Sequence, residues 1–192
     1  MVDRKRVCPA EQAGSLDNGF RRFFQNPSKI LKPYIKDGMT VLDLGCGPGF
    51  FSVEMAKMVG KNGKVIAVDV QEEMLEKLKN KIKGTKIEKR IKLHRCEENR
   101  IGVTDKVDFI LAFYMVHEVP NQEILLREII SILKPNGKAF IVEPKFHVSK
   151  EVFEETKKAV KRLGFEIINQ PKLFMSRGIV FKNAIVNTSK ET

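Results

Sequence analysis

The chain has 192 residues, 42% of them hydrophobic and 31% charged, which is the balance of an ordinary soluble domain with one substantial core. No apolar run approaches the ~20 residues that a membrane span needs, and the N-terminus lacks the apolar core of a signal peptide, so we expect a cytoplasmic protein. The net charge of +11 leaves an acidic partner open, whereas Cys8, Cys46 and Cys96 are too few and too scattered for a disulfide framework or a metal site.

Residues 1–38 precede the first predicted strand, and we expect them to be helical. Helical spacing relates four apolar residues in the middle of this segment, Leu16, Phe20, Phe23 and Phe24. Asn26 and Pro27 then break the pattern, and Ser28 is predicted to cap a second short helix that runs to Ile35.

The rest of the chain is organised around the sequence VLDLGCGPGFFS at residues 41–52. It predicts a buried strand at 39–44, a glycine turn and a helix at 50–59. Glycine at alternate positions lets the backbone turn sharply and lets a ligand approach main-chain atoms. Phe50 stands where the dinucleotide pattern G-x-G-x-x-G has its third glycine, and no P-loop Gly-Lys-Ser/Thr follows. Asp43 would repel a pyrophosphate but could receive an ammonium group, directly or through water, so we expect a ligand with a cationic end.

Two further strands are predicted at residues 64–69 and 91–95, and the first of them ends at Asp69. The helix between them is expected to bury four apolar residues, Met74, Leu75, Leu78 and Ile82, and to direct its lysines to solvent. The lysine-rich residues 77–92 contain no aromatic side chains that could stack on bases. We therefore interpret them as a solvated surface rather than as a site for RNA or an acidic substrate.

The second half of the chain continues the alternation of strands and helices. Strands are predicted at 107–113 and 138–143, with a turn at 135–137 and a closing antiparallel pair at 165–169 and 179–186. Helices are predicted at 149–163 and at 122–133, the latter burying Ile124, Leu125, Ile129, Ile130 and Leu133. The fold class is therefore α/β, a Rossmann-like doubly wound sheet of seven strands at residues 39–187, mostly parallel with an antiparallel last strand. We expect a disordered tail at residues 188–192.

The sequence VLDLGCGPGF resembles the cofactor motif of class I S-adenosylmethionine-dependent methyltransferases. Three more stretches support the resemblance in the family's order: VIAVDV at 65–70, IKLHRCEEN at 91–99 and VDFILAFYMVHEV at 107–119. Within that superfamily the chain is most similar to the small-molecule branch typified by the quinone-biosynthesis C-methyltransferases. The resemblance implies S-adenosylmethionine as the cofactor and residues 1–38 as a lid over its cleft, or alternatively as a segment packed on the sheet edge.

The resemblance also implies which residues contact the cofactor. Asp69 is placed to accept both ribose hydroxyls, and the next residues to cover one adenine face. Cys96 stands where family members often have an Asp that meets the adenine amino group; since a thiol is a poor acceptor, Glu97 or a backbone group is expected to take over. The other predicted contacts are Asp43, Gly45, Cys46, Gly47, Gly49 and Phe50 at the turn, Val70, Gln71 and Met74 at the adenine, and Ala112 and Phe113 beside the methionyl part.

The residues after the fourth strand are expected to face the reactive centre, because this strand lies beside the first. The catalytic candidates are Tyr114, His117 and Glu118, since histidine titrates near neutrality and a carboxylate can orient it. A histidine that only caps or packs a helix start is the alternative for His117. The implied reaction is an in-line displacement on the sulfonium methyl by a small-molecule acceptor, for which alignment is the main requirement.

Other functions stay open at the level of sequence. The basic surface would suit RNA or protein methylation, but residues 113–116 read FYMV and lack the Asn/Asp-Pro-Pro-Tyr/Phe motif of amine-methylating nucleic-acid enzymes. A thiol or metalloid methyltransferase would need Cys8 and Cys96 as thiolate ligands. A non-catalytic subunit would bind S-adenosylmethionine without turning it over. The oligomeric state and the methylated atom are not specified by the sequence.

Overall fold

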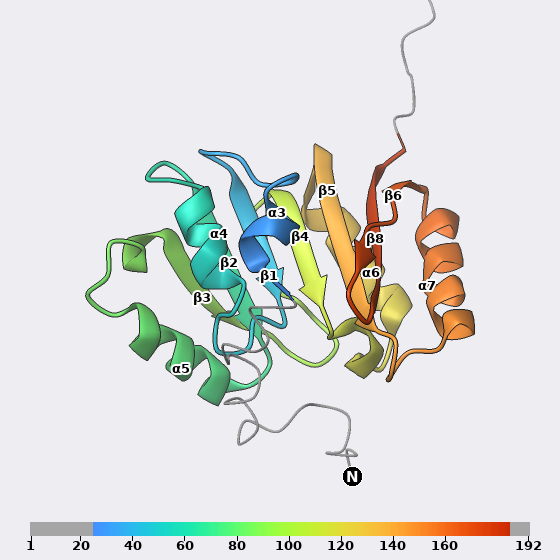
Figure 1. Cartoon of the computed structure of the whole chain (residues 1–192), viewed down its shortest axis with the longest axis horizontal. Coiled ribbons are helices and arrows are strands. Elements are labelled where there is room, and N and C mark those ends of the chain that lie inside the picture. The colour runs from blue at the N-terminus through green and yellow to red at the C-terminus, as the bar shows by residue number, and fades with distance from the viewer. Residues whose placement is uncertain (1–24, 185–192) are drawn as a thin grey trace, which may run out of the picture.

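The computed structural model describes residues 25–184 of the chain. Our expectations for the apolar residues of the lid helix (Leu16, Phe20, Phe23 and Phe24), for Cys8 and for the tail at 188–192 lie outside this range. Within it, eight strands form one sheet with helices on both faces (Figure 1). No helix in the described range is both long and apolar enough to cross a membrane.

The sheet has the order β3, β2, β1, β4, β5, β8, β6, and β7 pairs with β8 outside this path. Strands β1 to β5 pair in parallel, so their carboxyl ends meet at one edge, whereas β8 runs antiparallel to β5 and β6. The doubly wound sheet predicted from the sequence is confirmed, with β7 as an added two-residue strand. The strands are β1 Thr40–Leu44, β2 Lys64–Asp69, β3 Ile91–Arg95, β4 Val107–Phe113, β5 Leu133–Pro144, β6 Phe165–Asn169, β7 Lys172–Leu173 and β8 Ser176–Asn183.

The helices form two layers because the strands bury both of their faces. Neighbouring residues of β1 such as Val41 and Leu42 belong to different apolar clusters, as the twofold alternation of a strand requires. The cluster with Val41 includes residues of α3, α4 and α5, and the cluster with Leu42 includes residues of α6 and α7 (Figure 1). The helices are α3 Pro27–Leu31, α4 Ser52–Met58, α5 Glu72–Ile82, α6 Gln122–Ile132 and α7 Lys150–Arg162, with short 3-10 helices η2 Glu88–Arg90 and η3 Val116–Glu118.

The start of α3 differs from the prediction. Asn26 rather than Ser28 caps it, since the Asn26 side chain accepts a hydrogen bond from the Lys29 backbone N–H at 3.1 Å. Pro27 begins the helix, where a missing N–H leaves no hydrogen bond unmade. The helix ends at Leu31, earlier than predicted.

Helix α6 buries a face that is slightly rotated from the predicted one. Leu125 and Ile129 are buried as predicted, but Leu126 and Ile132 are buried too, whereas Ile124 is 43% exposed. Spacings of three and four residues allow two overlapping apolar faces on a helix this rich in Ile and Leu, and packing on the sheet selects one of them.

Three element boundaries also differ from the prediction. Helix α4 begins at Ser52 instead of residue 50, because the two preceding phenylalanines still belong to the glycine turn. Strand β5 includes the predicted turn at 135–137, where its pairing with β4 is irregular. Strand β8 begins and ends earlier than the predicted 179–186.

The face of α6 can be tested by a matched pair of substitutions. We expect Ile129→Ala to lower the free energy of unfolding by roughly 2–5 kcal/mol, because it leaves a cavity in the core. Ile124→Ala, at the exposed position of the same helix, is expected to cost less than about 1 kcal/mol. Urea unfolding of both variants measures the difference, and equal losses would contradict the assigned face.

Candidate functional site

The glycine turn follows β1 and is anchored on β2. The backbone N–H groups of Gly45 and Cys46 both donate to the Val68 carbonyl at 2.9 Å. Gly47 and Gly49 have φ of +52° and +87°, which side chains rarely tolerate. A Cβ on Gly49 would lie 2.3 Å from Leu78 of α5, whereas one on Gly47 would meet no described atom within 4 Å. The turn is therefore closed against α5 at Gly49 and open at Gly47, where a ligand can reach the main chain.

Asp69 joins the end of β2 to this turn. Its Oδ2 accepts a hydrogen bond from the Gly47 backbone N–H at 2.8 Å, and its Oδ1 accepts one from Gln71 N–H at 3.0 Å. The side chain is nearly buried, and this burial raises the pKa of the Asp69 carboxyl while the backbone donors partly lower it. Two segments that the sequence predicts to bind one cofactor are thus in direct contact.

Asp43 lies beneath the turn at the end of β1. It is only 2% exposed, and its Oδ2 accepts a hydrogen bond from the Ser52 hydroxyl at 2.5 Å. Ser52 is the first residue of α4, so this bond connects strand, turn and helix. Phe50, in the turn, is buried and packs edge-on against Phe51. The predicted contact of Asp43 with an ammonium group stays a prediction.

The residues predicted to surround the adenine lie at the ends of β2 and β3. Val70 and Gln71 are half-buried, Met74 is buried and Glu97 is exposed, with its backbone paired to that of Arg100.

Neither described cysteine is poised to act as a thiolate. Cys96 is half-buried, its N–H donates to the Asp69 carbonyl, and burial raises the pKa of its thiol to about 11. The pKa of the Cys46 thiol is raised as well, mainly by burial and to a smaller extent by the charge of Asp43. Among the described residues no group of three or more His, Cys, Asp or Glu side chains could hold a metal ion.

The end of β4 carries aromatic residues in a constrained arrangement. Ala112 and Phe113 are buried, and the Phe113 ring lies 4.5 Å from the Phe51 ring, between centroids. Tyr114 has a φ of 63°, which is unusual for a bulky side chain and is found most often at functional sites. Its hydroxyl is hydrogen-bonded to the Ser176 hydroxyl of β8 and accepts from the Gln25 side chain at 2.6 Å.

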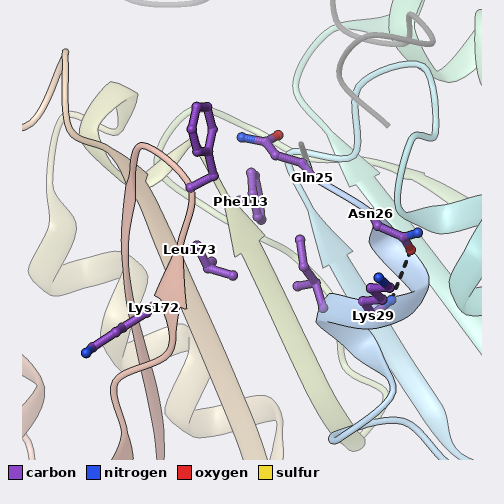
Figure 2. Close-up of a pocket in the computed structure, with 8 residues that line it drawn as sticks. Gln25, Asn26, Lys29, Phe113, Lys172 and Leu173 are labelled. Carbon is purple, nitrogen blue, oxygen red and sulfur yellow. Dashed lines mark hydrogen bonds between the residues drawn. The ribbon is translucent and has the colours of Figure 1, made fainter. Parts of the chain in front are cut away.

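A cavity of about 320 Å³ opens beside Phe113, between α3 and the turn that joins β7 to β8 (Figure 2). In Figure 2, Phe113 and Leu173 lie on one side of the cavity, and Gln25 and Asn26 extend from the chain at the start of α3. Its lining combines apolar groups with amides and lysines and consists of Gln25, Asn26, Lys29, Ile30, Phe113, Lys172, Leu173 and Phe174. The volume is within the range of pockets for small molecules.

His117 and Glu143 form a hydrogen-bonded pair at the same edge of the sheet. His117 lies in η3 after β4, and Glu143 is near the end of β5. The His117 Nδ1–H donates to Glu143 Oε2 at 2.5 Å, and the His117 backbone N–H donates to Oε1 at 3.2 Å. Burial lowers the pKa of His117, but the hydrogen bond and charge of Glu143, with the charge of Glu118, raise it above the ordinary value on balance.

Glu143 is not among the residues predicted from the sequence, where Glu118 is the candidate carboxylate next to His117. A signal was present, since Glu143 comes at the end of an apolar run, as Asp69 does, and is the penultimate residue of its strand, as Asp43 is. A buried acid at the carboxyl end of a parallel strand is therefore a candidate functional residue in this fold.

Comparisons with known proteins agree with this geometry. A family model described as a methyltransferase domain matches residues 35–182. The demethylmenaquinone methyltransferase of Lactobacillus johnsonii is 35% identical over 127 residues, covering 66% of this chain and 50% of that protein. The ubiquinone/menaquinone biosynthesis C-methyltransferase of Cronobacter sakazakii is 28% identical over 135 residues, covering 70% and 52%. The chain thus spans about half the length of the curated relatives it matches.

A solved structure matches more completely. The crystal structure of a SAM-dependent methyltransferase from Aquifex aeolicus has a TM-score of 0.82 and 30% sequence identity to this chain. The match covers 91% of this chain and 98% of that one.

The raised pKa values of the two cysteines predict slow thiol chemistry. In a Cys8→Ser variant at pH 8, we expect Cys46 and Cys96 to react with DTNB at least about a hundredfold more slowly than a cysteine peptide, because few of the thiols are ionised. The absorbance of the thionitrobenzoate released from DTNB measures the rate of the reaction. Guanidinium is the control, since both thiols should react at once when unfolded; rapid labelling of the folded chain would contradict the assigned environment.

Proposed function

We propose that this chain, which belongs to the methyltransferase-domain family of class I S-adenosylmethionine-dependent methyltransferases, transfers a methyl group from that cofactor to a small-molecule acceptor. The observation that carries the proposal is the hydrogen bond between the Asp69 carboxylate and the Gly47 N–H. It brings the predicted ribose-binding acid against the open part of the glycine turn. Two curated relatives that the chain matches are named as quinone methyltransferases, which supports a small acceptor.

The residues at this edge fit S-adenosylmethionine. The space at Gly47 allows a ligand to approach the main chain, and Asp69 lies beside it with both carboxylate oxygens oriented by backbone donors. Asp43 adds a second buried acid beneath the turn, which suits a ligand that carries positive charge. When bound, the cofactor supplies an electrophilic methyl group.

The protein's own part in the reaction is to bind and align. Asp69 would hold the ribose hydroxyls, Val70, Gln71 and Met74 would border the adenine, and Ala112 and Phe113 would lie beside the methionyl part. Holding two reactants in line contributes up to ~7–11 kcal/mol to lowering a barrier. His117, Glu118 and Tyr114 lie after β4, and we propose that His117 takes a proton from the acceptor.

We place the acceptor in the cavity beside Phe113. Ile30, Leu173 and Phe174 offer apolar contact, and the Gln25 and Asn26 amides offer hydrogen bonds to oxygen substituents. Demethylmenaquinone, which the Lactobacillus johnsonii relative methylates by name, joins an apolar ring system to ring oxygens and so suits such a lining.

The alternatives have less support. A thiol or metalloid mechanism needs thiolates, whereas the environments of Cys46 and Cys96 favour protonated thiols. A nucleic-acid substrate would need exposed base-stacking groups along the basic segment, but α5 buries Met74, Leu75, Leu78 and Ile82 and exposes glutamates and lysines to solvent. A non-catalytic subunit would bind the cofactor without releasing S-adenosylhomocysteine, so a product assay separates it from an enzyme.

The cofactor site can be tested with Asp69. We expect Asp69→Asn to weaken S-adenosylmethionine binding roughly tenfold or more, because the ribose loses a charged hydrogen-bond acceptor. Asp105→Asn is the control, since Asp105 is half-buried, lies outside the proposed site and is paired with Lys64 and Lys92. Isothermal titration gives both affinities, and the parent chain should bind S-adenosylmethionine much more tightly than NAD. Equal affinity for the two ligands would contradict the assignment of S-adenosylmethionine as the cofactor.

The acceptor cavity can be tested with Leu173. A short-chain 2-prenyl-1,4-naphthoquinol serves as the acceptor, and the release of S-adenosylhomocysteine is measured. We expect Leu173→Ser to raise the acceptor KM roughly tenfold, because apolar contact is lost, without changing cofactor affinity. Ile168→Ser is the matched control, since Ile168 is a partly exposed residue of β6 that does not line the cavity. An equal effect of both substitutions would place the acceptor elsewhere.

A further inference from the structure

We propose that Glu143 is a positioning residue that holds His117 with its Nε2 lone pair ready to take a proton from the methyl acceptor. The inference rests on the proposed function and adds a chemical requirement to it. The acceptor must carry an ionisable hydrogen, such as that of a phenol or enol hydroxyl, whose loss creates the nucleophile.

The pair has the geometry of a fixed base. Glu143 is 2% exposed, and both of its carboxylate oxygens accept a hydrogen bond from His117. Oε2 accepts from the imidazole ring, and Oε1 accepts from the backbone N–H. A buried carboxylate is costly unless such donors satisfy it. The two bonds therefore fix both the position of η3 and the rotation of the imidazole ring.

These bonds also select the tautomer of the ring. Because Nδ1 donates to Glu143, the neutral imidazole carries its hydrogen on Nδ1 and its lone pair on Nε2. No other described residue makes a hydrogen bond to the His117 ring, whose side chain is 19% exposed. Nε2 is thus left available to a molecule that enters the edge of the sheet.

The surroundings of His117 favour proton uptake. Glu143 faces it from β5, Glu118 is its neighbour in η3, and the His147 ring lies 5.7 Å away, edge to face, from the loop after β5. The two carboxylates stabilise the protonated ring, which is the product of the proton transfer.

A chain of contacts connects the pair to the proposed acceptor cavity. Pro144, next to Glu143, pairs with Ser176 of β8. Ser176 is hydrogen-bonded to the Tyr114 hydroxyl, which also accepts from Gln25 in the cavity lining. The base and the cavity are therefore parts of one assembly at the carboxyl ends of β4 and β5.

The proposed step moves one proton and one methyl group. The proton of the acceptor hydroxyl moves to His117 Nε2, and the electron pair left on the acceptor forms the new bond to the methyl carbon. The carbon–sulfur bond of the sulfonium breaks with its electron pair retained by sulfur as a neutral thioether. The protonated His117 then returns its proton to water.

The test combines NMR of His117 with the pH profile of turnover. In the parent chain, the ring nitrogen shifts should show Nδ1 protonated and Nε2 unprotonated above the His117 pKa. In Glu143→Gln we expect this pKa to fall by about one unit or more, because the negative charge that stabilises the imidazolium is lost. With the naphthoquinol acceptor, kcat should rise with pH through the same pKa in the parent chain. In Glu143→Gln the rise of kcat should move to lower pH, and the maximal kcat at high pH should fall roughly tenfold or more.

The controls separate positioning from packing. Glu166→Gln removes an exposed carboxylate of β6 and should leave the His117 pKa and kcat unchanged. Cofactor affinity should be the same in all three chains. A proton on Nε2 in the neutral parent chain, read without any variant, would overturn the inference even if Glu143→Gln failed to fold. The inference would also be overturned if Glu143→Gln shifted the His117 pKa but left the pH dependence of kcat unchanged. Failure to bind S-adenosylmethionine would instead count against the proposed function, independently of the NMR result.

Discussion

The hydrogen bond from Gly47 to Asp69 is the interaction on which the rest of the site depends. It requires the turn after β1 and the end of β2 to lie side by side, which the parallel pairing of these strands provides. It also requires a backbone N–H that points sideways out of the turn, and the positive φ of Gly47 supplies it. A substitution at Gly47 would strain the backbone and move the donor, so the acid at Asp69 and the glycine before it work as one unit.

The same principle recurs along the carboxyl edge of the sheet. Three buried acids lie at or next to the last residue of the parallel strands β1, β2 and β5, and each is stabilised by donors from the segment that follows or flanks it. Asp43 receives the Ser52 hydroxyl, Asp69 receives backbone N–H groups, and Glu143 receives His117. Burial without these donors would cost several kcal/mol per group. The fold therefore concentrates acidic side chains at the edge of the sheet where we propose that ligands bind, and local donors hold these side chains in place.

The sequence predicts the bounds of several strands better than it predicts helix caps, helix faces and contacts between distant residues. The strands at 64–69, 91–95 and 107–113 agree with the structure at both ends, because each is a compact apolar run bounded by polar or turn residues. The predicted cap of α3 was wrong, and the predicted face of α6 was right at Leu125, Ile129 and Leu133 but wrong at Ile124, since several residues satisfied the same local rule and packing chose among them. The pairing of His117 with Glu143 depends on β4 and β5 being neighbours, which is a tertiary fact that no local pattern contains.

The acceptor is harder to infer than the cofactor for a related physical reason. The cofactor residues from Asp43 to Met74 lie mostly in one strand, turn, helix and strand unit, so their spacing in sequence already fixes their spacing in the fold. The cavity beside Phe113 instead takes one wall from α3 and another from the β7–β8 turn, at opposite ends of the described chain. Neither wall has to satisfy a backbone constraint shared with β1 and β2. Their side chains can therefore vary with the acceptor while the glycine turn stays the same, and in our proposal the lining of this cavity, together with proton transfer to His117, discriminates among acceptors.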